Sequence, residues 1–312
     1  MEFIKLLETH RNPILDRFFS VITYFGDEIL ILGAAFIVLW CINKRVGYTI
    51  IYSLMLGVTV NQFLKGFFRV PRPWVRDPSL SVVEGAKEAA TGYSFPSGHT
   101  QNSTVMFGSV ARSVKKRIVR TAMVWLIIVV GFSRMYLGVH TPADVITSWA
   151  IGAFLVLGVY PLLDRAENRR AFGTLPDLFF LAVSAALVIF AELSPAGIGE
   201  AAEFAEEGVT NAYMTLGVAA SFAIVRYLDE RKIRYDVKAV WWAQILKCLL
   251  GMAVVLGLRI GLKPVLGAVF KDRHIGTAIR YFIIAIFAGA VWPLTFRFWG
   301  GLGRKSRDVK TL

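Results

Sequence analysis

The sequence predicts an all-α fold, a polytopic bundle of membrane-spanning helices, and two observations carry that prediction. The first is composition: 55% of the 312 residues are hydrophobic, more than an ordinary soluble domain contains. The second is that these residues gather in long apolar runs, most of which approach the roughly 20 residues that cross a bilayer core. The runs are 29–42, 48–68, 118–137, 145–163, 177–193, 211–228, 239–258 and 279–299.

Two of the predicted helices depart from this pattern. The run 29–42 is short, so we expect its helix to begin near Phe19, after an amphipathic interfacial helix formed by the first residues. Those first residues lack the small-residue cleavage site of a secretory signal. Residues 99–114 are rich in Ser, Thr and Asn, and we expect this helix to lie inside the bundle. With it, the predicted total is about nine spans.

Composition changes after Leu163, which predicts two regions. Residues 1–165 contain every motif described below, whereas residues 177–312 form four more apolar spans without a recognisable catalytic motif. The polar stretch 164–176 between them is typical of a linker. We therefore predict a core, residues 1–165, and a C-terminal transmembrane extension, residues 177–312, whose role the sequence leaves open.

The net charge of +13 is distributed as in a membrane protein rather than a nucleic-acid-binding protein. Lys and Arg gather in short loops between apolar runs, which are 43–45, 112–120, 165–170, 226–238 and 304–310. If the spans alternate, all five lie on one side, which we assign to the cytoplasm. The opposite, extracytoplasmic side receives the N-terminus and residues 69–93, 138–141 and 192–207. The sequence thus predicts a multi-pass protein of the cell membrane.

The basic segment 259–280 violates this charge bias, because it is expected to face outward. It is apolar, basic and interrupted by Pro264 and several Gly residues. We favour a re-entrant or interfacial element that holds anionic lipid headgroups over the site. A basic outer loop and a miscounted span remain alternatives.

The segment Pro96-Ser97-Gly98-His99 is the first of three that carry chemistry. Ser97 is a good N-cap residue directly before a helical run. The free N–H groups and the positive dipole end of such a helix suit a phosphate, and Gly98 allows close approach of the backbone. His99 then lies in the first turn, where it can act as an acid or base.

A second helix start lies at Thr141-Pro142-Ala143-Asp144, with Thr as cap, Pro at the first helical position and Asp at the third. His140 stands four residues before Asp144, so a turn can bring the carboxylate to one imidazole nitrogen. That hydrogen bond would fix the tautomer and leave the other nitrogen free to attack. Arg134, at the outer end of the preceding run, carries a planar fork of donors that matches phosphate oxygens.

The third segment is the end of the second span, where Lys65 precedes Arg72. The prolines on either side of Arg72 restrict its backbone and stop the helix. Both side chains can add positive charge where a transferring phosphoryl group needs it. The polar positions Asn61, Gln62, Gln101 and Asn102 are expected either to line a cavity there or to bridge helices.

All three segments fall on the same predicted side of the membrane. Together they supply an attacking group, a proton donor and donors for phosphate oxygens, which is what phosphoryl transfer without a metal requires. No residue spacing supports a metal site, and Cys41 and Cys248 both lie in apolar runs, as small buried hydrophobes do. We therefore expect no metal and no cofactor.

The chain resembles the type 2 phosphatidic acid phosphatase family, whose pattern is K-x6-R-P, P-S-G-H and S-R-x5-H-x3-D. The matching residues are Lys65, Arg72, Pro73, Pro96, Ser97, Gly98, His99, Ser133, Arg134, His140 and Asp144. The resemblance covers roughly residues 20–165. It implies a six-helix phosphatase core, so that the whole bundle is this core plus about four additional C-terminal helices.

The resemblance also implies a metal-independent mechanism with a histidine nucleophile. In it His140 attacks phosphorus, Asp144 orients His140, and His99 protonates the leaving oxygen and later activates water. Lys65, Arg72 and Arg134 would hold the phosphate together with Ser97 and the backbone of Gly98.

The expected function is hydrolysis of the terminal phosphate of a membrane lipid phosphate or pyrophosphate at the outer leaflet. Undecaprenyl pyrophosphate, phosphatidylglycerol phosphate and phosphatidate are candidate substrates, and nothing in the sequence chooses among them. The expected partners are this lipid and the surrounding membrane lipids, with no nucleic acid. A lipid phosphotransferase that uses the same phosphohistidine is the alternative, as is a lipid transporter or scramblase built on the C-terminal spans.

Overall fold

The computed structural model describes residues 1–168, 175–195, 198–270 and 272–302, and all regular structure in these residues is helical. The α-helices are α1 (Glu2–Thr9), α2 (Pro13–Ile22), α3 (Glu28–Ile37), α4 (Lys44–Phe68), α5 (Pro73–Arg76), α6 (Gly98–Ser113), α7 (Arg117–Tyr136), α8 (Pro142–Phe154), α9 (Tyr160–Asn168), α10 (Leu175–Leu193), α11 (Glu200–Leu228), α12 (Trp241–Val269), α13 (Arg273–Ile286) and α14 (Phe296–Gly301). The predicted all-α helical bundle is confirmed.

In the described part of the chain, seven helical segments are long and apolar enough to cross a membrane. An eighth span results if the pair Pro13–Gly26 and Glu28–Ile42, bent by 52° at the break, counts as one. Four of the seven follow residue 174, so the predicted four C-terminal spans are confirmed. With the bent pair counted as a span, the total is one below the predicted nine, because α6 has only 16 residues.

Helix α6 lies inside the bundle, as its polar composition predicted. It packs against α4, α7 and α8, and its side chains Thr100, Gln101 and Ser103 are buried. Gln101 Nε2 donates to the carbonyl oxygen of Gly57 on α4 at 2.6 Å. The hydroxyls of Ser103 and Thr104 donate to the carbonyl oxygen of Thr100, so these polar groups are satisfied without water.

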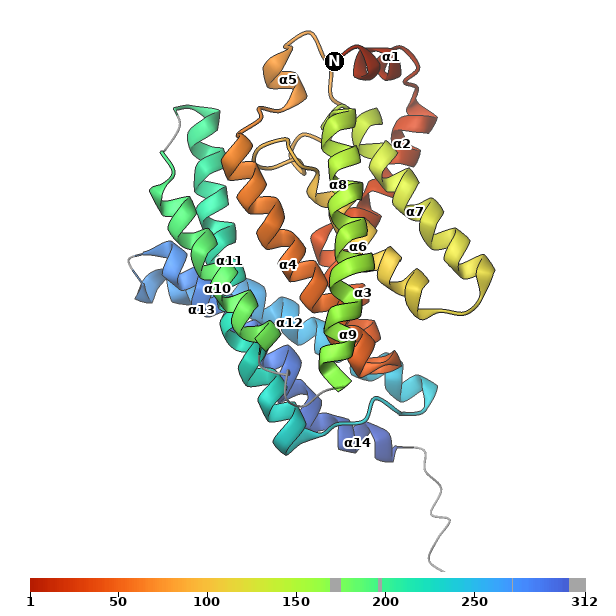
Figure 1. The fold of residues 1–312 in the computed structure, drawn as a ribbon, viewed down its shortest axis with the longest axis vertical. Helices are drawn as coiled ribbons and strands as arrows, with labels where there is room; N and C mark the ends of the chain where they lie inside the picture. The colour runs from red at the N-terminus through yellow and green to blue at the C-terminus, as the bar shows by residue number, and fades with distance from the viewer. Residues whose placement is uncertain (169–174, 196–197, 271, 303–312) are drawn as a thin grey trace, which may run out of the picture.

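The two ends of the bundle differ in what they carry (Figure 1). The N-terminus, α5 and the start of α8 lie at the top of the view, and α9 and α14 lie at the bottom. The end of α4 and the start of α8, which contain two of the predicted motif segments, therefore share one end of the molecule.

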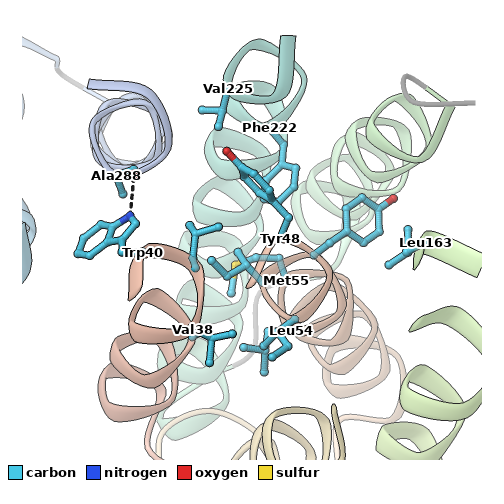
Figure 2. Close-up of a cluster of buried hydrophobic side chains, with 14 of the residues drawn as sticks. Val38, Trp40, Tyr48, Leu54, Met55, Leu163, Phe222, Val225 and Ala288 are labelled. Carbon is cyan, nitrogen blue, oxygen red and sulfur yellow. Dashed lines mark hydrogen bonds between the residues drawn. The ribbon is translucent and has the colours of Figure 1, made fainter. Parts of the chain in front are cut away.

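One apolar cluster joins the two regions of the chain (Figure 2). Tyr48 and Met55 of α4 pack with Phe222 and other side chains of α11, and the rings of Tyr48 and Phe222 meet edge to face. The indole nitrogen of Trp40 donates to the carbonyl oxygen of Ala288 at 3.0 Å. The extension thus packs against the core through a continuous hydrophobic cluster.

The basic segment 259–280 differs from the favoured prediction of a separate interfacial element. Arg259 and Lys263 belong to the single helix α12, which includes Pro264 in its interior, and Arg273 begins α13. A proline inside a membrane helix is tolerated when its neighbours satisfy the freed backbone carbonyl. The segment therefore comprises the end of α12, the start of α13 and the short connection between them, with Lys271 outside the described residues.

The predicted linker 164–176 is partly helical. Helix α9 continues to Asn168 and α10 begins at Leu175, and residues 169–174 lie outside the described part of the chain.

Candidate active site

The start of α6 forms one wall of the site. The Oγ atom of Ser97 accepts hydrogen bonds from the backbone N–H of Thr100 at 3.4 Å and from its hydroxyl at 2.9 Å. Ser97 is therefore the N-cap that the sequence predicted, and its own N–H donates to the carbonyl oxygen of Asp144 at 3.3 Å. This last bond joins the start of α6 to the start of α8.

The start of α8 has the predicted capping box. The N–H of Asp144 donates to the Oγ1 atom of Thr141 at 3.4 Å, and the N–H of Thr141 donates to the Oδ2 atom of Asp144 at 2.8 Å. Gly138 turns the chain ahead of this cap with φ +82°, where a Cβ atom would lie 2.9 Å from the carbonyl oxygen of Ser81. The turn places His140 directly before the helix.

His140 is held from both sides. The Oδ2 atom of Asp144 lies 3.3 Å from its Nδ1 atom and also accepts the Ser94 hydroxyl at 2.6 Å. The Nη1 group of Arg72 donates to the Nε2 atom at 2.9 Å. Because a guanidinium can only donate, Nε2 carries the lone pair and Nδ1 carries the proton.

The pKa of His140 favours the neutral ring that this tautomer requires. Burial lowers the pKa of His140 below its usual value, and the charge of Arg72 adds to this effect, while Asp144 opposes it. The imidazole is therefore neutral near pH 7. A neutral ring with its proton toward a carboxylate leaves Nε2 free to act as a nucleophile once Arg72 turns to a ligand.

Arg72 is fixed by backbone carbonyl groups. Its Nε group donates to Gly92 at 2.8 Å, its Nη1 group donates to Val139 at 3.2 Å, and its Nη2 group donates to Thr91. The side chain is only 2% exposed. Lys65 lies in the last turn of α4, and its Nζ atom donates to the same Thr91 carbonyl oxygen at 3.5 Å.

Arg134 is buried on α7 with few partners. Its Nη1 group donates to the hydroxyl of Thr23 at 2.7 Å, while its Nε group has no hydrogen-bond partner among the described residues. The side chain is 1% exposed. A buried donor without a partner is costly, and an oxyanion in the adjoining space would satisfy it.

These side chains surround a cavity of about 200 Å³. Of the predicted site residues, it is lined by Lys65, Arg72, Gly98, His99, Arg134 and His140. Ser97 and Asp144 lie behind its wall, where they hold the two helix starts and the imidazole. The structure therefore brings together residues that are up to 75 positions apart, counted from Lys65 to His140.

Polar positions beside the motifs divide between the two expected roles. Asn61, Gln62 and Asn102 line the cavity, whereas Gln101 bridges helices. The Nδ2 group of Asn61 donates both to the carbonyl oxygen of Pro96 at 3.3 Å and to the Oε1 atom of Gln101 at 3.2 Å.

The sequence reasoning missed several lining residues. Asp27 and Glu28, at the start of α3, face the cavity, as do Glu207 and Asn211 of α11. Glu207 approaches the cationic wall closely, because a Cβ atom on Gly92 would lie 3.3 Å from its Oε2 atom and 3.6 Å from the Nζ atom of Lys65. No motif spacing marks Glu207, and the acidic run around it reads as a solvated loop, so the fold alone reveals this contribution of the extension.

The fold and the cavity define a multi-pass helical membrane protein with a cationic, histidine-containing pocket. The PAP2 superfamily model matches residues 46–167, and the model described as "PAP2 superfamily phosphatase, transmembrane extension" matches residues 213–305. The chain belongs to the PAP2 superfamily of phosphatases, which confirms the resemblance read from the motifs.

Individual relatives are about one quarter identical to the chain over the aligned residues. A probable sphingosine-1-phosphate phosphatase of Dictyostelium discoideum is 26% identical over 53% of the chain and 41% of its own length. An undecaprenyl-diphosphatase of Sulfolobus acidocaldarius is 24% identical over 50% of the chain and 74% of its own length. The crystal structure of Aquifex aeolicus LpxE aligns with a TM-score of 0.46 and 26% identity, covering 52% of the chain and 93% of LpxE. The chain thus matches less than half the length of the Dictyostelium relative.

Proposed function

We propose that the protein is a lipid phosphatase that removes the terminal phosphate of a membrane lipid phosphate or pyrophosphate through a phosphohistidine, without a metal ion. The observation that carries this proposal is His140, held between Asp144 and Arg72 at the wall of a cationic cavity. The family and the names of the two relatives support it, since both are phosphatases of lipid phosphates.

In the first step the Nε2 lone pair of His140 forms a bond to phosphorus as the bond from phosphorus to the lipid oxygen breaks. The negative charge of the bound phosphate favours the protonated form of His99, which gives its proton to that leaving oxygen. The Nδ1 proton of His140 stays directed at Asp144, whose negative charge stabilises the cationic phosphoimidazole. The departing lipid is the alcohol, or the monophosphate when the substrate is a pyrophosphate.

In the second step His99, now neutral, takes a proton from water as the water oxygen attacks phosphorus. The bond between Nε2 and phosphorus breaks, inorganic phosphate leaves, and His99 is protonated again. Lys65, Arg72 and Arg134 stabilise the charge on the transferring oxygens, together with the N–H groups at the α6 start, Gly98 included. Ser97 supports them by capping that helix start.

We further propose that this site faces the extracytoplasmic side of the cell membrane. The charge pattern supports this placement, because the five basic loops and the motif segments fall on opposite sides when the spans alternate. Substrates would then be lipids presented at the outer leaflet, of the undecaprenyl pyrophosphate, phosphatidylglycerol phosphate or phosphatidate type.

The test is phosphate release by the purified full chain from these three lipids, with and without a chelator. We expect release that persists with chelator and that is abolished by His140→Ala and by His99→Ala. His10→Ala is the matched control, because His10 is exposed at the end of α1 and should leave the rate unchanged. Strict dependence on a divalent cation, or an active His140→Ala variant, would overturn the mechanism. Phosphate recovered on an acceptor lipid instead of free would indicate transfer rather than hydrolysis.

A further inference from the structure

A large apolar groove lies between the core and the extension. It encloses about 1480 Å³ and is bounded by α4, by the stretch from α8 to α9, and by α10. Leu56 and Phe63 line the groove from α4, and Phe154 lines it from α8. Phe179 and Val183 line it from α10. Phe63, Phe154 and Phe179 are all exposed, so the groove is open on the outside of the protein.

The groove leads to the candidate active site. At Leu187 it adjoins a narrow space of about 30 Å³ between α4, α10 and α11, which is also lined by Phe190. That narrow space shares Gln62, Lys65 and Glu207 with the catalytic cavity. The apolar groove, this narrow space and the catalytic cavity therefore lie in series, and each shares lining residues with the next.

Phe190 lines the narrow space that lies between the apolar groove and the catalytic cavity. Its ring lies 4.6 Å from that of Phe63, between centroids, and a Cβ atom on Gly66 would come within 2.9 Å of it. The absence of a side chain at Gly66 gives the ring its place, and a rotation of Phe190 would widen the passage.

We infer that this groove holds the hydrocarbon chain of the lipid whose phosphate is cleaved, an inference that rests on the proposed function. The catalytic cavity of about 200 Å³ is large enough for a headgroup. It is smaller than the pockets of roughly 300–1,000 Å³ that hold drug-sized ligands. A chain of the substrate must therefore lie elsewhere, and the groove is apolar, open on the outside of the protein and separated from the cavity only by the narrow space at Leu187.

The groove contributes orientation more than raw affinity. Bilayer lipid is as apolar as the groove, so transfer of the chain into it gains little from the hydrophobic effect. Packing of the chain between α4 and α10 instead holds the phosphate near His140, and energy from this remote contact favours the reacting geometry. The extension thus acquires a function, since α10 supplies one wall.

The experiment fills the groove and compares a long and a short substrate. Ala186, which lines the groove from α10, is replaced by Trp, and Ala182→Trp is the matched control, an exposed alanine of the same helix that does not line the groove. The probes are hexadecyl phosphate in detergent micelles and butyl phosphate in solution. We expect kcat/KM for hexadecyl phosphate to fall about tenfold in Ala186→Trp, with butyl phosphate unchanged and the control like wild type.

A second variant tests the same groove in case Ala186→Trp does not fold. Phe179→Ala removes part of the wall and should lower the ratio of the long-chain to the short-chain kcat/KM in the same direction. An unchanged ratio in both groove variants, or an equal fall in Ala182→Trp, would overturn the inference. If the wild-type protein releases phosphate from neither ester nor from any lipid phosphate, the proposed function itself is wrong.

Discussion

The core and the extension each bury an arginine in a membrane helix, and the two arginines have different surroundings. Arg134 of α7 is 1% exposed, borders the catalytic cavity, and has an Nε group without a hydrogen-bond partner in the described chain. Arg226 of α11 is 7% exposed and ion-paired, with Asp177 at 3.6 Å and Glu230 at 3.5 Å.

This difference separates charge that serves a ligand from charge that serves the fold. A buried cation beside carboxylates is compensated within the protein and has little capacity left for an anion. A buried cation with a hydroxyl partner and an open cavity carries its desolvation cost until an anion binds. Among the described residues, the arginine without an ion pair belongs to the motif-bearing core, and the ion-paired one belongs to the extension.

Breaking the compensated pair should produce the largest effect, and on stability alone. Arg226→Met removes the cation that lies 3.6 Å from the buried Asp177, so we expect a loss of about 3–5 kcal/mol in the free energy of unfolding. Thermal unfolding in detergent measures the loss, and phosphate release by the remaining folded protein should stay at the wild-type rate.

The matched control removes both charges. The double variant with Arg226→Met and Asp177→Leu should recover most of the stability, because replacing a buried ion pair by apolar groups of similar volume is often neutral. A double variant as unstable as the single one would show that the arginine stabilises the fold through packing instead.

The second prediction applies the same substitution to the core. In the proposed mechanism Arg134 donates to the oxygens of the transferring phosphate, so we expect Arg134→Met to lower kcat/KM about 100- to 1,000-fold. The unfolding temperature should stay the same or rise, because the substitution removes a poorly compensated buried charge. Initial rates and thermal unfolding of the same preparation check both parts. A destabilised Arg134→Met variant with unchanged kcat/KM would show that Arg134, like Arg226, stabilises the fold and does not bind the substrate.

A partly exposed pair should give a smaller effect. The Nζ atom of Lys44 lies 3.0 Å from the Oδ2 atom of Asp229, and a third of the Lys44 side chain remains exposed. Lys44→Met should cost about 1–3 kcal/mol of unfolding free energy, less than Arg226→Met, because solvent screens the Lys44 end of the pair while the buried Asp229 loses a partner; activity should not change. A loss as large as that of Arg226→Met would mean that partial exposure does not reduce the pair's contribution.

The sequence predicts the core site well because local rules place its residues. The Thr141 cap, the Ser97 cap and the four-residue spacing of His140 and Asp144 follow from helix geometry, and the structure has all three. That these residues lie at one cavity follows from the sequence only through their shared membrane side, which the distribution of Lys and Arg among the loops indicates.

The remaining site residues depend on packing that a local pattern does not encode. Glu207 enters the cavity because α11 packs on α4, a contact between segments about 150 residues apart in sequence. The predicted break in the basic segment 259–280 differs from the structure for a related reason: Pro264 and its neighbouring glycines indicated a break, whereas α12 continues through them. Proline is a weaker helix breaker within a membrane bundle than in a soluble helix.

The smallest expected effect concerns a charge of α12 that lies outside the cavity, and it tests whether the comparison of the two arginines applies to other charges of the extension. Lys263 is exposed near the end of α12, away from the residues that line the cavity. If the extension's charges outside the cavity serve only the fold, Lys263→Gln should change both stability and substrate binding by less than about 0.5 kcal/mol. KM for a long-chain lipid phosphate measures the second quantity. A clear rise in KM would mean that this cation attracts anionic headgroups, so that the extension, too, holds charge for a ligand.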